Sequence, residues 1–298
     1  MAAAAFKDLG LSRWWQTGYP NQLSSRGILE PETSMRDIVM AAICGTCIPP
    51  IVIEASTEKF WMDMRDVIFS EDRLENADAE AEDALNRVGI SEPSQVLDVG
   101  CGIGRHSWSM ARRGHHVTGI DQIAGYIEEA QRPHQAADKA PKFINADLVD
   151  YKGLPFGAFD AALCLYHSLG FSADPGDDIV FLRRIRAALR PGGKLLLDLI
   201  NPESFLPGER REYEETTSSG LARSVIEVAE MRDRYEIIFT PAGSPNVHYR
   251  ARHRLFSARR IQELLEAAGF AGVTVGQPLI GSYENGSDRF TVIASADA

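Results

Sequence analysis

The sequence has few cysteines and fewer basic than acidic residues, and each shortage excludes a class of protein. Only 4 cysteines occur in 298 residues, and no signal-peptide pattern opens the chain, so we expect a reducing, cytoplasmic setting. Acidic residues outnumber basic ones by 42 to 31, which gives a net charge of -11. Because nucleic acids and anionic lipids are bound mainly through clustered Lys and Arg, we expect neither nucleic acid nor membrane as a partner. A small molecule is the expected partner.

Two short features raise alternatives that the rest of the sequence does not complete. Residues 38–53 form an apolar run, but a membrane helix needs roughly 20 residues, and this run contains Pro49-Pro50. We therefore interpret it as buried packing or a subunit contact. Cys44 and Cys47 have CxxC spacing, but no second CxxC and no histidine pair completes a zinc site, so we predict no metal site.

Strand-like and helical segments alternate along most of the chain. An amphipathic helix is predicted from Ser70, an N-cap followed by two acidic residues, to Gly89. Next come the apolar segments VLDVG, HHVTGI, KFINA, FDAALCL and KLLLDLI, which are typical of buried parallel strands. Helical patterns separate these segments. The predicted fold class is therefore α/β, with a doubly wound, mostly parallel sheet.

Two regions depart from this alternation. Residues 203–256 contain the segments ARSVIEVAEM, YEIIFT and VHYRARHRLF, which predict a small inserted antiparallel element on the substrate side. On the last segment, Tyr249 and His253 share the face that we expect to be covered. Residues 1–57 mix aromatics with Gly and Pro, so we expect an N-terminal extension that forms a lid or a subunit contact, the second giving a homo-oligomer. Residues 58–298 form the main domain.

A strand, a glycine-rich turn, a helix and a second strand occupy residues 96–121. The turn has the pattern GxGxG, whereas the dinucleotide pattern GxGxxG fails at Arg105 and a Walker GK[ST] is absent. Asp98 stands before the turn, and Asp121 ends the second strand. An acid in the position of Asp121 can accept hydrogen bonds from both hydroxyls of a ribose. The stretch therefore predicts a nucleoside ligand without a pyrophosphate.

Four segments in this order carry a resemblance to a known family. They are VLDVGCGIGRHS through GID, NADLVD, FDAALCLYHSLGF and LRPGGKLLLDL. Together they resemble class I S-adenosylmethionine-dependent methyltransferases over roughly residues 60–298. The resemblance implies a Rossmann-like sheet of seven strands, S-adenosylmethionine as cofactor and S-adenosylhomocysteine as product.

The resemblance also assigns the cofactor contacts. They are Asp98, Gly100, Gly102, Gly104, Asp121, Gln122, Ala146, Asp147, Leu148, Leu165 and Tyr166. Asp121 would hold the ribose, Asp147 would accept from the adenine amine, and Leu148 would offer its backbone N–H. For the three acids, turn or helix capping is the alternative.

A finer similarity points to glycine N-methyltransferases and antibiotic amino-sugar N-methyltransferases, through CLYHSLGF and the inserted strands. It implies that Arg73 grips the carboxylate of the cofactor, with a solvated helix arginine as the alternative. The glycine enzymes carry an arginine where this chain has Ile200 or Asn201, so glycine is not the expected acceptor. The aromatic residues suggest a bulkier, less polar acceptor.

Candidate catalytic residues follow the fourth strand and line the insertion. His167 and Tyr166 stand where parallel sheets bind ligands, and His253 lies on the covered face of the insertion. Each histidine is either a catalytic group or a hydrogen-bonded structural residue. We predict a small-molecule methyltransferase of specialised metabolism with an N, O or C acceptor. The alternatives are a C-methyltransferase on an aromatic or isoprenoid acceptor, and a regulatory module that binds the cofactor without catalysis.

Overall fold

The computed structural model of the chain describes residues 51–54, 58–132, 139–280 and 288–297. The chain divides into two units, Met1–Val52 and Ile53–Ala298. The expectations for the CxxC pair, and those for a lid or subunit contact in the N-terminal extension apart from its residues 51–54, fall on residues outside the described ranges. The structure of the second unit positions the site.

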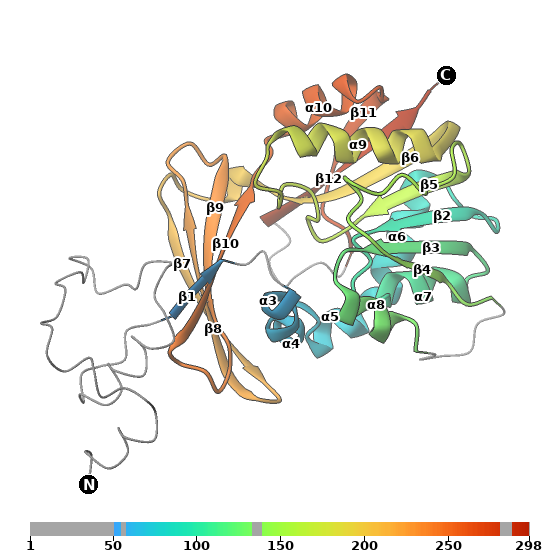
Figure 1. The fold of residues 1–298 in the computed structure, drawn as a ribbon. Coiled ribbons are helices and arrows are strands. Elements are labelled where there is room, and N and C mark those ends of the chain that lie inside the picture. Colours follow the sequence, from blue (N-terminus) through green and yellow to red (C-terminus); the bar gives the residue numbers. More distant parts are fainter. Residues whose placement is uncertain (1–50, 55–57, 133–138, 281–287, 298) are drawn as a thin grey trace, which may run out of the picture. The chain divides into compact units, whose positions relative to one another are not determined.

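Seven strands of the second unit form one mixed sheet (Figure 1). They are β2 (Gln95–Val99), β3 (His116–Asp121), β4 (Lys142–Asn145), β5 (Phe159–Cys164), β6 (Leu189–Ile200), β11 (Ala271–Gly276) and β12 (Arg289–Ala296). Their order is β11-β12-β6-β5-β2-β3-β4. The pairs from β6 to β4 are parallel, whereas β12 is antiparallel to both β6 and β11. The predicted doubly wound, mostly parallel α/β sheet is confirmed.

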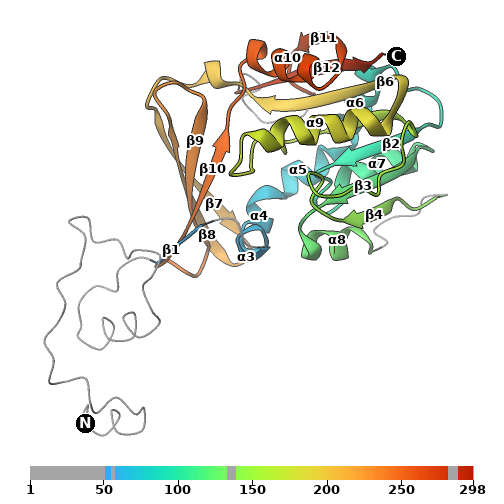
Figure 2. The same cartoon turned by 45° about the horizontal axis from the view of Figure 1, so that its top comes forward.

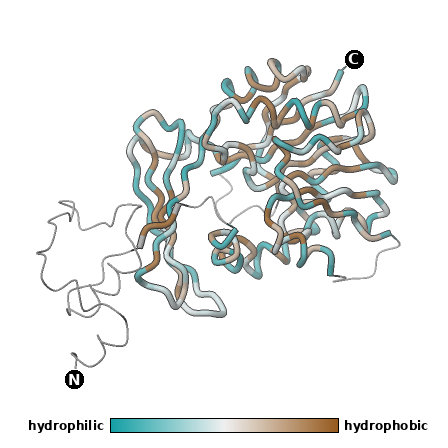
Figure 3. Tube along the Cα trace, viewed as in Figure 1, coloured by the Kyte–Doolittle hydropathy of each residue, from teal (hydrophilic) through white to brown (hydrophobic). Residues whose placement is uncertain are grey.

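Helices cover both faces of this sheet. They are α6 (Ala77–Val88), α7 (Arg105–Arg112), α8 (Ala124–Ala130), α9 (Gly176–Ala188) and α10 (Ala258–Ala267). Because alternate strand residues point to opposite faces, Ala161 and Leu163 of β5 pack with α6 and α7, while Ala162 and Cys164 pack with α9 and α10. The central strands β2 and β5 are accordingly mostly hydrophobic (Figure 3). The strand order reverses between β5 and β2, and ligands bind beside such reversals.

The helix predicted from Ser70 to Gly89 consists of two helices. They are α5 (Glu71–Glu75) and α6, and they meet at Asn76. In a continuous helix the carbonyl of Arg73 would accept from the amide of residue 77, but here the guanidinium of Arg105 takes it, at 2.6 Å. The two predicted ends are correct, with Ser70 at the N-cap and Gly89 left-handed at the C-cap.

The four inserted strands lie within residues 203–256. They are β7 (Arg210–Thr217), β8 (Gly220–Val228), β9 (Arg234–Thr240) and β10 (Val247–Arg254), and each is antiparallel to the next along the chain. Tyr249 and His253 lie on one buried face of this sheet, as predicted, and are 0% and 2% exposed. Phe60 of α3 (Glu58–Asp63) packs against this face. Figure 2 shows α3 and the helix that follows it, α4 (Arg65–Ile68).

A further short strand, β1, spans Ile51–Glu54. Across the described ranges, no helix combines the length and the apolar character that crossing a membrane requires.

Candidate functional site

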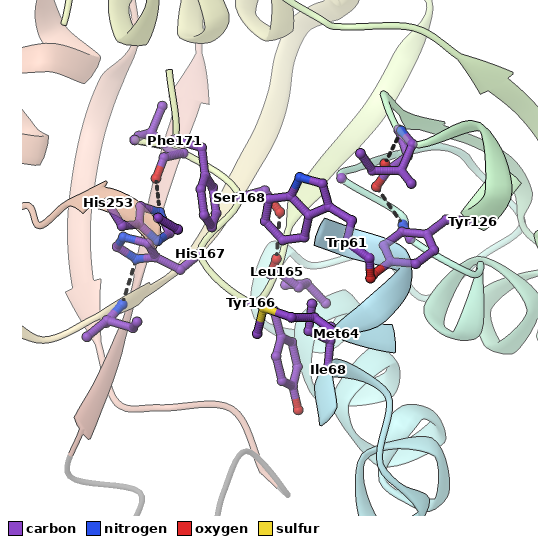
Figure 4. A pocket seen from close by; sticks show the side chains of 18 of the residues that line it. Trp61, Met64, Ile68, Tyr126, Leu165, Tyr166, His167, Ser168, Phe171 and His253 are labelled. Atoms are coloured by element: carbon purple, nitrogen blue, oxygen red, sulfur yellow. Dashed lines mark hydrogen bonds between the residues drawn. The ribbon is translucent and has the colours of Figure 1, made fainter. Parts of the chain in front are cut away.

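A cavity of about 1310 Å³ lies at the carboxyl ends of β2, β3 and β5, beside the reversal of strand order. Its lining comes from the strand ends, from α3–α5 and from the inner face of the inserted sheet (Figure 4). Pockets for one small ligand measure roughly 300–1,000 Å³. This cavity therefore has room for two ligands, a cofactor at the strand ends and an acceptor against the insertion.

The turn after β2 lets a ligand approach bare backbone. Gly100 and Gly102 have φ of +70° and +54°, in the left-handed region that favours glycine. A Cβ on Gly100 would stand 2.3 Å from the hydroxyl oxygen of Ser168, and a Cβ on Gly102 would stand 2.6 Å from the ring of Phe69. Both glycines line the cavity, and no side chain larger than hydrogen fits at either position.

Asp121, at the end of β3, faces the cavity with its carboxylate fixed by backbone. Oδ2 accepts from the amide of Gly102 and Oδ1 from the amide of Ile123, each at 2.9 Å. Burial raises the pKa of Asp121, while these two amides oppose that shift. Each carboxylate oxygen keeps capacity for a further hydrogen bond. This geometry suits the predicted bonds to two ribose hydroxyls.

The residues predicted to hold the adenine also line the cavity. They are Ala146, Asp147 and Leu148, and the predicted cofactor contact Gln122 lines it as well. Asp147 is exposed, and its Oδ1 accepts from the amide of Val149 at 2.9 Å. One of its oxygens therefore has the turn-capping role that was the alternative to ligand binding. Leu148 is 4% exposed and packs into the core, which leaves its backbone as the part able to meet a ligand.

Two predicted cofactor residues lie behind the cavity wall. Asp98 is 1% exposed, and its Oδ2 accepts from the hydroxyl of Ser107 at 2.6 Å. A Cβ on Gly104 would stand 2.8 Å from the ring of Phe143. Neither residue lines the cavity. In this geometry Asp98 supports the turn from below, and Gly104 permits close packing of α7 on the sheet.

The chain leaves β5 through two consecutive residues in the left-handed region, Tyr166 with φ of +58° and His167 with φ of +61°. Such conformations cost about 1–3 kcal/mol each in residues other than glycine, and they cluster at functional sites. Strand β6 holds both residues, because Asp198 accepts from the amide of Tyr166 through Oδ2 and from the amide of His167 through its carbonyl, at 3.0 and 2.9 Å. Leu165, before the turn, lines the cavity as well.

Both candidate histidines have their ring nitrogens occupied. Nδ1 of His167 accepts from the amide of Ile200 at 2.8 Å, so its Nε2 carries the hydrogen and donates to the carbonyl of Arg254 at 3.0 Å. His253 donates from Nε2 to the carbonyl of Leu169, and its Nδ1 accepts from the hydroxyl of Tyr235. Burial lowers the pKa of His167 to about 4 and that of His253 well below its usual value. This geometry opposes a role as general base for either residue and favours the structural alternative.

A buried polar network that the sequence did not reveal surrounds Tyr166. The carboxylate of Glu80, on α6, accepts from the Tyr166 hydroxyl, from Arg105 at 2.6 Å and from His106 at 2.8 Å. Burial acts to raise the pKa of Glu80, but His106 and Arg105 lower it to about 2. The tyrosine hydroxyl therefore donates to a carboxylate and is not a base at this place.

Three arginines gather around the ring of Tyr166. The guanidinium carbons of Arg105, Arg289 and Arg73 lie 4.2, 5.2 and 5.9 Å from its centroid. Arg289 makes a two-bond ion pair with Asp198, at 2.8 and 2.7 Å. Arg73 donates to the carbonyls of Val67 and Ile68 at 3.0 Å. Because Arg73 also lines the cavity, the predicted contact with the cofactor carboxylate remains compatible with its position.

The segment α3–α5, residues 58–75, covers both halves of the cavity. Phe60 packs with Phe239 and Tyr249 of the inserted sheet, while Phe69 packs with Ile103 and Tyr126 beside the glycine turn. Trp61 stands between them and meets Phe171 edge to face, with ring centroids 5.0 Å apart. The ring centroids of Phe171 and His253 lie 3.5 Å apart, and Figure 4 shows Phe171 between His253 and Trp61.

The fold and the site define the class of protein. A mostly parallel sheet with a GxGxG turn and with Asp121 at the next strand end suits a nucleoside, and S-adenosylmethionine fits the residues present. Gly100 and Gly102 leave room for close approach, Asp121 suits a ribose, and the cavity continues past the cofactor half. These features are those of a class I methyltransferase.

Comparison with known proteins agrees with this class. Residues 96–193 match the family model of a methyltransferase domain. Over 70% of its length the chain is 29% identical to trans-aconitate 2-methyltransferase of Paracidovorax citrulli, 83% of which is covered. It is 34% identical over 41% of its length to a ubiquinone biosynthesis O-methyltransferase of Xanthomonas axonopodis pv. citri, 54% of which is covered.

A solved structure shares the fold as well. The methyltransferase CcbJ from Streptomyces caelestis superimposes with a TM-score of 0.59 at 16% identity, covering 75% of this chain and 90% of CcbJ. The protein is an S-adenosylmethionine-dependent methyltransferase of class I.

Proposed function

We propose that this enzyme methylates a small molecule with a bulky, mostly apolar body, in specialised metabolism. One observation carries the proposal. The cavity continues from Gly100 and Asp121 to the inner face of the inserted sheet, where Ile226, Ile237 and Ala251 supply an apolar wall. These apolar side chains suit an acceptor that is held by its body.

The residues of the chain bind and orient the two reactants. S-adenosylmethionine supplies a methyl group on a sulfonium, which a nucleophile attacks in line. Asp121 and the glycine turn fix the donor, and Trp61 and Phe171 exclude water from the space between donor and insertion. Holding two reactants in line lowers the barrier by avoiding the loss of translational freedom during the reaction.

The hydrogen-bonded ring nitrogens of the two histidines limit which type of atom can accept the methyl group. A neutral amine attacks without a strong base, whereas a hydroxyl or carbon nucleophile needs one. Since the ring nitrogens of His167 and His253 are both hydrogen-bonded, the site favours a nitrogen acceptor among the three that the sequence leaves open. The aromatic wall supports C-methylation of an aromatic or isoprenoid acceptor as second candidate, because aromatic faces stabilise developing positive charge.

Cofactor binding and acceptor identity can be tested in one series. We expect Asp121→Ala to weaken S-adenosylhomocysteine binding at least tenfold by calorimetry, whereas Asp150→Ala, at an exposed position of the loop after β4, leaves it unchanged. Unchanged affinity in Asp121→Ala would remove the ribose assignment. Release of S-adenosylhomocysteine from S-adenosylmethionine across a library of amines, alcohols and acids then identifies the acceptor. Turnover only with charged, hydrophilic acceptors would contradict the proposed apolar body.

A further inference from the structure

Glu215 is placed on the inner face of the inserted sheet. It pairs across β7 and β8 with Ala222, and the next inward residue of β7, Tyr213, pairs with Ser224. All four residues line the cavity. The small side chain of Ala222, directly across, leaves space beside Glu215 on this face.

The other acids of these strands serve a different purpose. Glu212, Glu214, Glu227 and Glu236 each form an ion pair with an arginine of the sheet. Of the five glutamates in β7–β10, strands that the structure describes in full, Glu215 is the one without a hydrogen bond or an ion pair. Arg73 acts on it only through longer-range electrostatics. The acid that turns inward is therefore the one that keeps its hydrogen-bonding capacity for a ligand.

Half-burial makes this arrangement costly without a ligand. Burial raises the pKa of Glu215 and Asp72 adds to that shift, while the positive charge of Arg73 opposes it. A partly desolvated carboxylate is stabilised when a cation or an N–H donor replaces the water it has lost. Ala222, directly across from Glu215, offers no such group, and no hydrogen bond or ion pair joins Glu215 to the hydroxyls of Tyr213 and Ser224 on the same face. A ligand in the cavity can therefore supply the partner.

We propose that Glu215 binds a protonated amine of the methyl acceptor, which makes the acceptor a basic amine with an apolar body. This inference rests on the proposed function and names the substrate class of the same cavity. The nitrogen that Glu215 binds need not be the atom that receives the methyl group. Glu215 acts as a specificity-determining residue, because it selects acceptors by charge.

Three indole probes of similar size and different charge test the inference. Tryptamine is cationic, tryptophol is neutral and indole-3-acetate is anionic at neutral pH. Their affinities are measured by calorimetry on the S-adenosylhomocysteine complex of the wild-type chain, of E215Q and of E214Q. Glu214 is the matched control, because it is the neighbouring acid of the same strand and pairs with Arg223 on the outer face.

We expect the wild-type complex to bind tryptamine at least tenfold more tightly than tryptophol, and indole-3-acetate most weakly. E215Q should bring tryptamine and tryptophol within threefold of each other, while E214Q keeps the wild-type preference. The inference is overturned if E215Q keeps the preference, if tryptamine binds no better than tryptophol, or if no probe binds. S-adenosylhomocysteine affinity is measured first and separately, so its absence would remove the proposed function instead.

Discussion

The backbone amide of Tyr166 donates to Oδ2 of Asp198 at 3.0 Å, and the same carboxylate forms a two-bond ion pair with Arg289. Asp198 is 0% exposed. One buried acid therefore holds the left-handed turn after β5 and the guanidinium that faces the ring of Tyr166. The hydrogen bonds that compensate for the strain of this turn come from β6, the neighbouring strand, and not from the turn itself.

Removing the charge of Asp198 should destabilise the protein strongly. Breaking a buried ion pair from one side leaves the other charge uncompensated and costs about 3–5 kcal/mol. We expect Asp198→Asn to lose that much free energy of unfolding in a denaturant titration. Asp233→Asn, which removes an exposed pair with Arg234, should change it by about 1 kcal/mol or less. Equal stability of the two variants would show that Asp198 does not hold the turn.

Substitutions at Gly102 and Gly157 distinguish the cost of backbone strain from the cost of steric contact. Both have positive φ, +54° and +61°, but a Cβ on Gly102 would meet Phe69 at 2.6 Å, whereas a Cβ on Gly157 would meet nothing within 4 Å. Gly157→Ala should cost only the left-handed penalty, about 1–2 kcal/mol. Gly102→Ala should cost more and also weaken S-adenosylhomocysteine binding at least tenfold, because Phe69 is pushed from the turn. Wild-type cofactor affinity in Gly102→Ala would mean that α3–α5 adjusts freely.

His167 predicts a dependence of stability on pH. Its pKa is about 4 in the folded protein, lowered by burial, and roughly 6.5 in the unfolded chain. Between these values the unfolded chain takes up a proton that the folded protein refuses, so stability falls as the pH drops from about 6.5 to about 4. The loss is roughly 3 kcal/mol.

Denaturant titrations from pH 7 to pH 4 check this. We expect His167→Gln to lose part of the wild-type slope. The remainder belongs to the other groups with shifted pKa, among them His253 and His106, whose pKa values are also lowered by burial. A slope identical to wild type would place the protonation elsewhere. We expect no inflection from His167 in the pH profile of turnover, because neither ring nitrogen is available to a substrate.

The sequence predicted those features that repeat along the chain. Apolar runs such as FDAALCL are nearly continuous, as expected for strands that are buried on both faces. Alternation on the last inserted strand placed Tyr249 and His253 on the covered face. The position of Asp121 beside the cavity was predicted from its place at the end of a strand. The predicted single helix after Ser70 was wrong, since the side chain of Arg105 interrupts it at Arg73.

The network around Tyr166 could not be predicted from local pattern. Arg289 and Asp198 are far apart in the sequence and meet only because β12 pairs with β6. The left-handed backbone at Tyr166 and His167 could not be predicted, because neither residue is a glycine. Glu80 did carry a signal, since it shares a buried helix face with Ala77, Ala81 and Ala84, and an acid on such a face needs a buried partner.

The covering segment α3–α5 couples the release of the product to the exchange of the cofactor. Phe60 rests on the inserted sheet and Phe69 on the glycine turn, so lifting this one piece of chain exposes both halves of the cavity at once. Departure of the methylated product and exchange of the spent cofactor would then share a single opening motion. Enzymes with this architecture are expected to turn over at the rate of that motion when chemistry is fast.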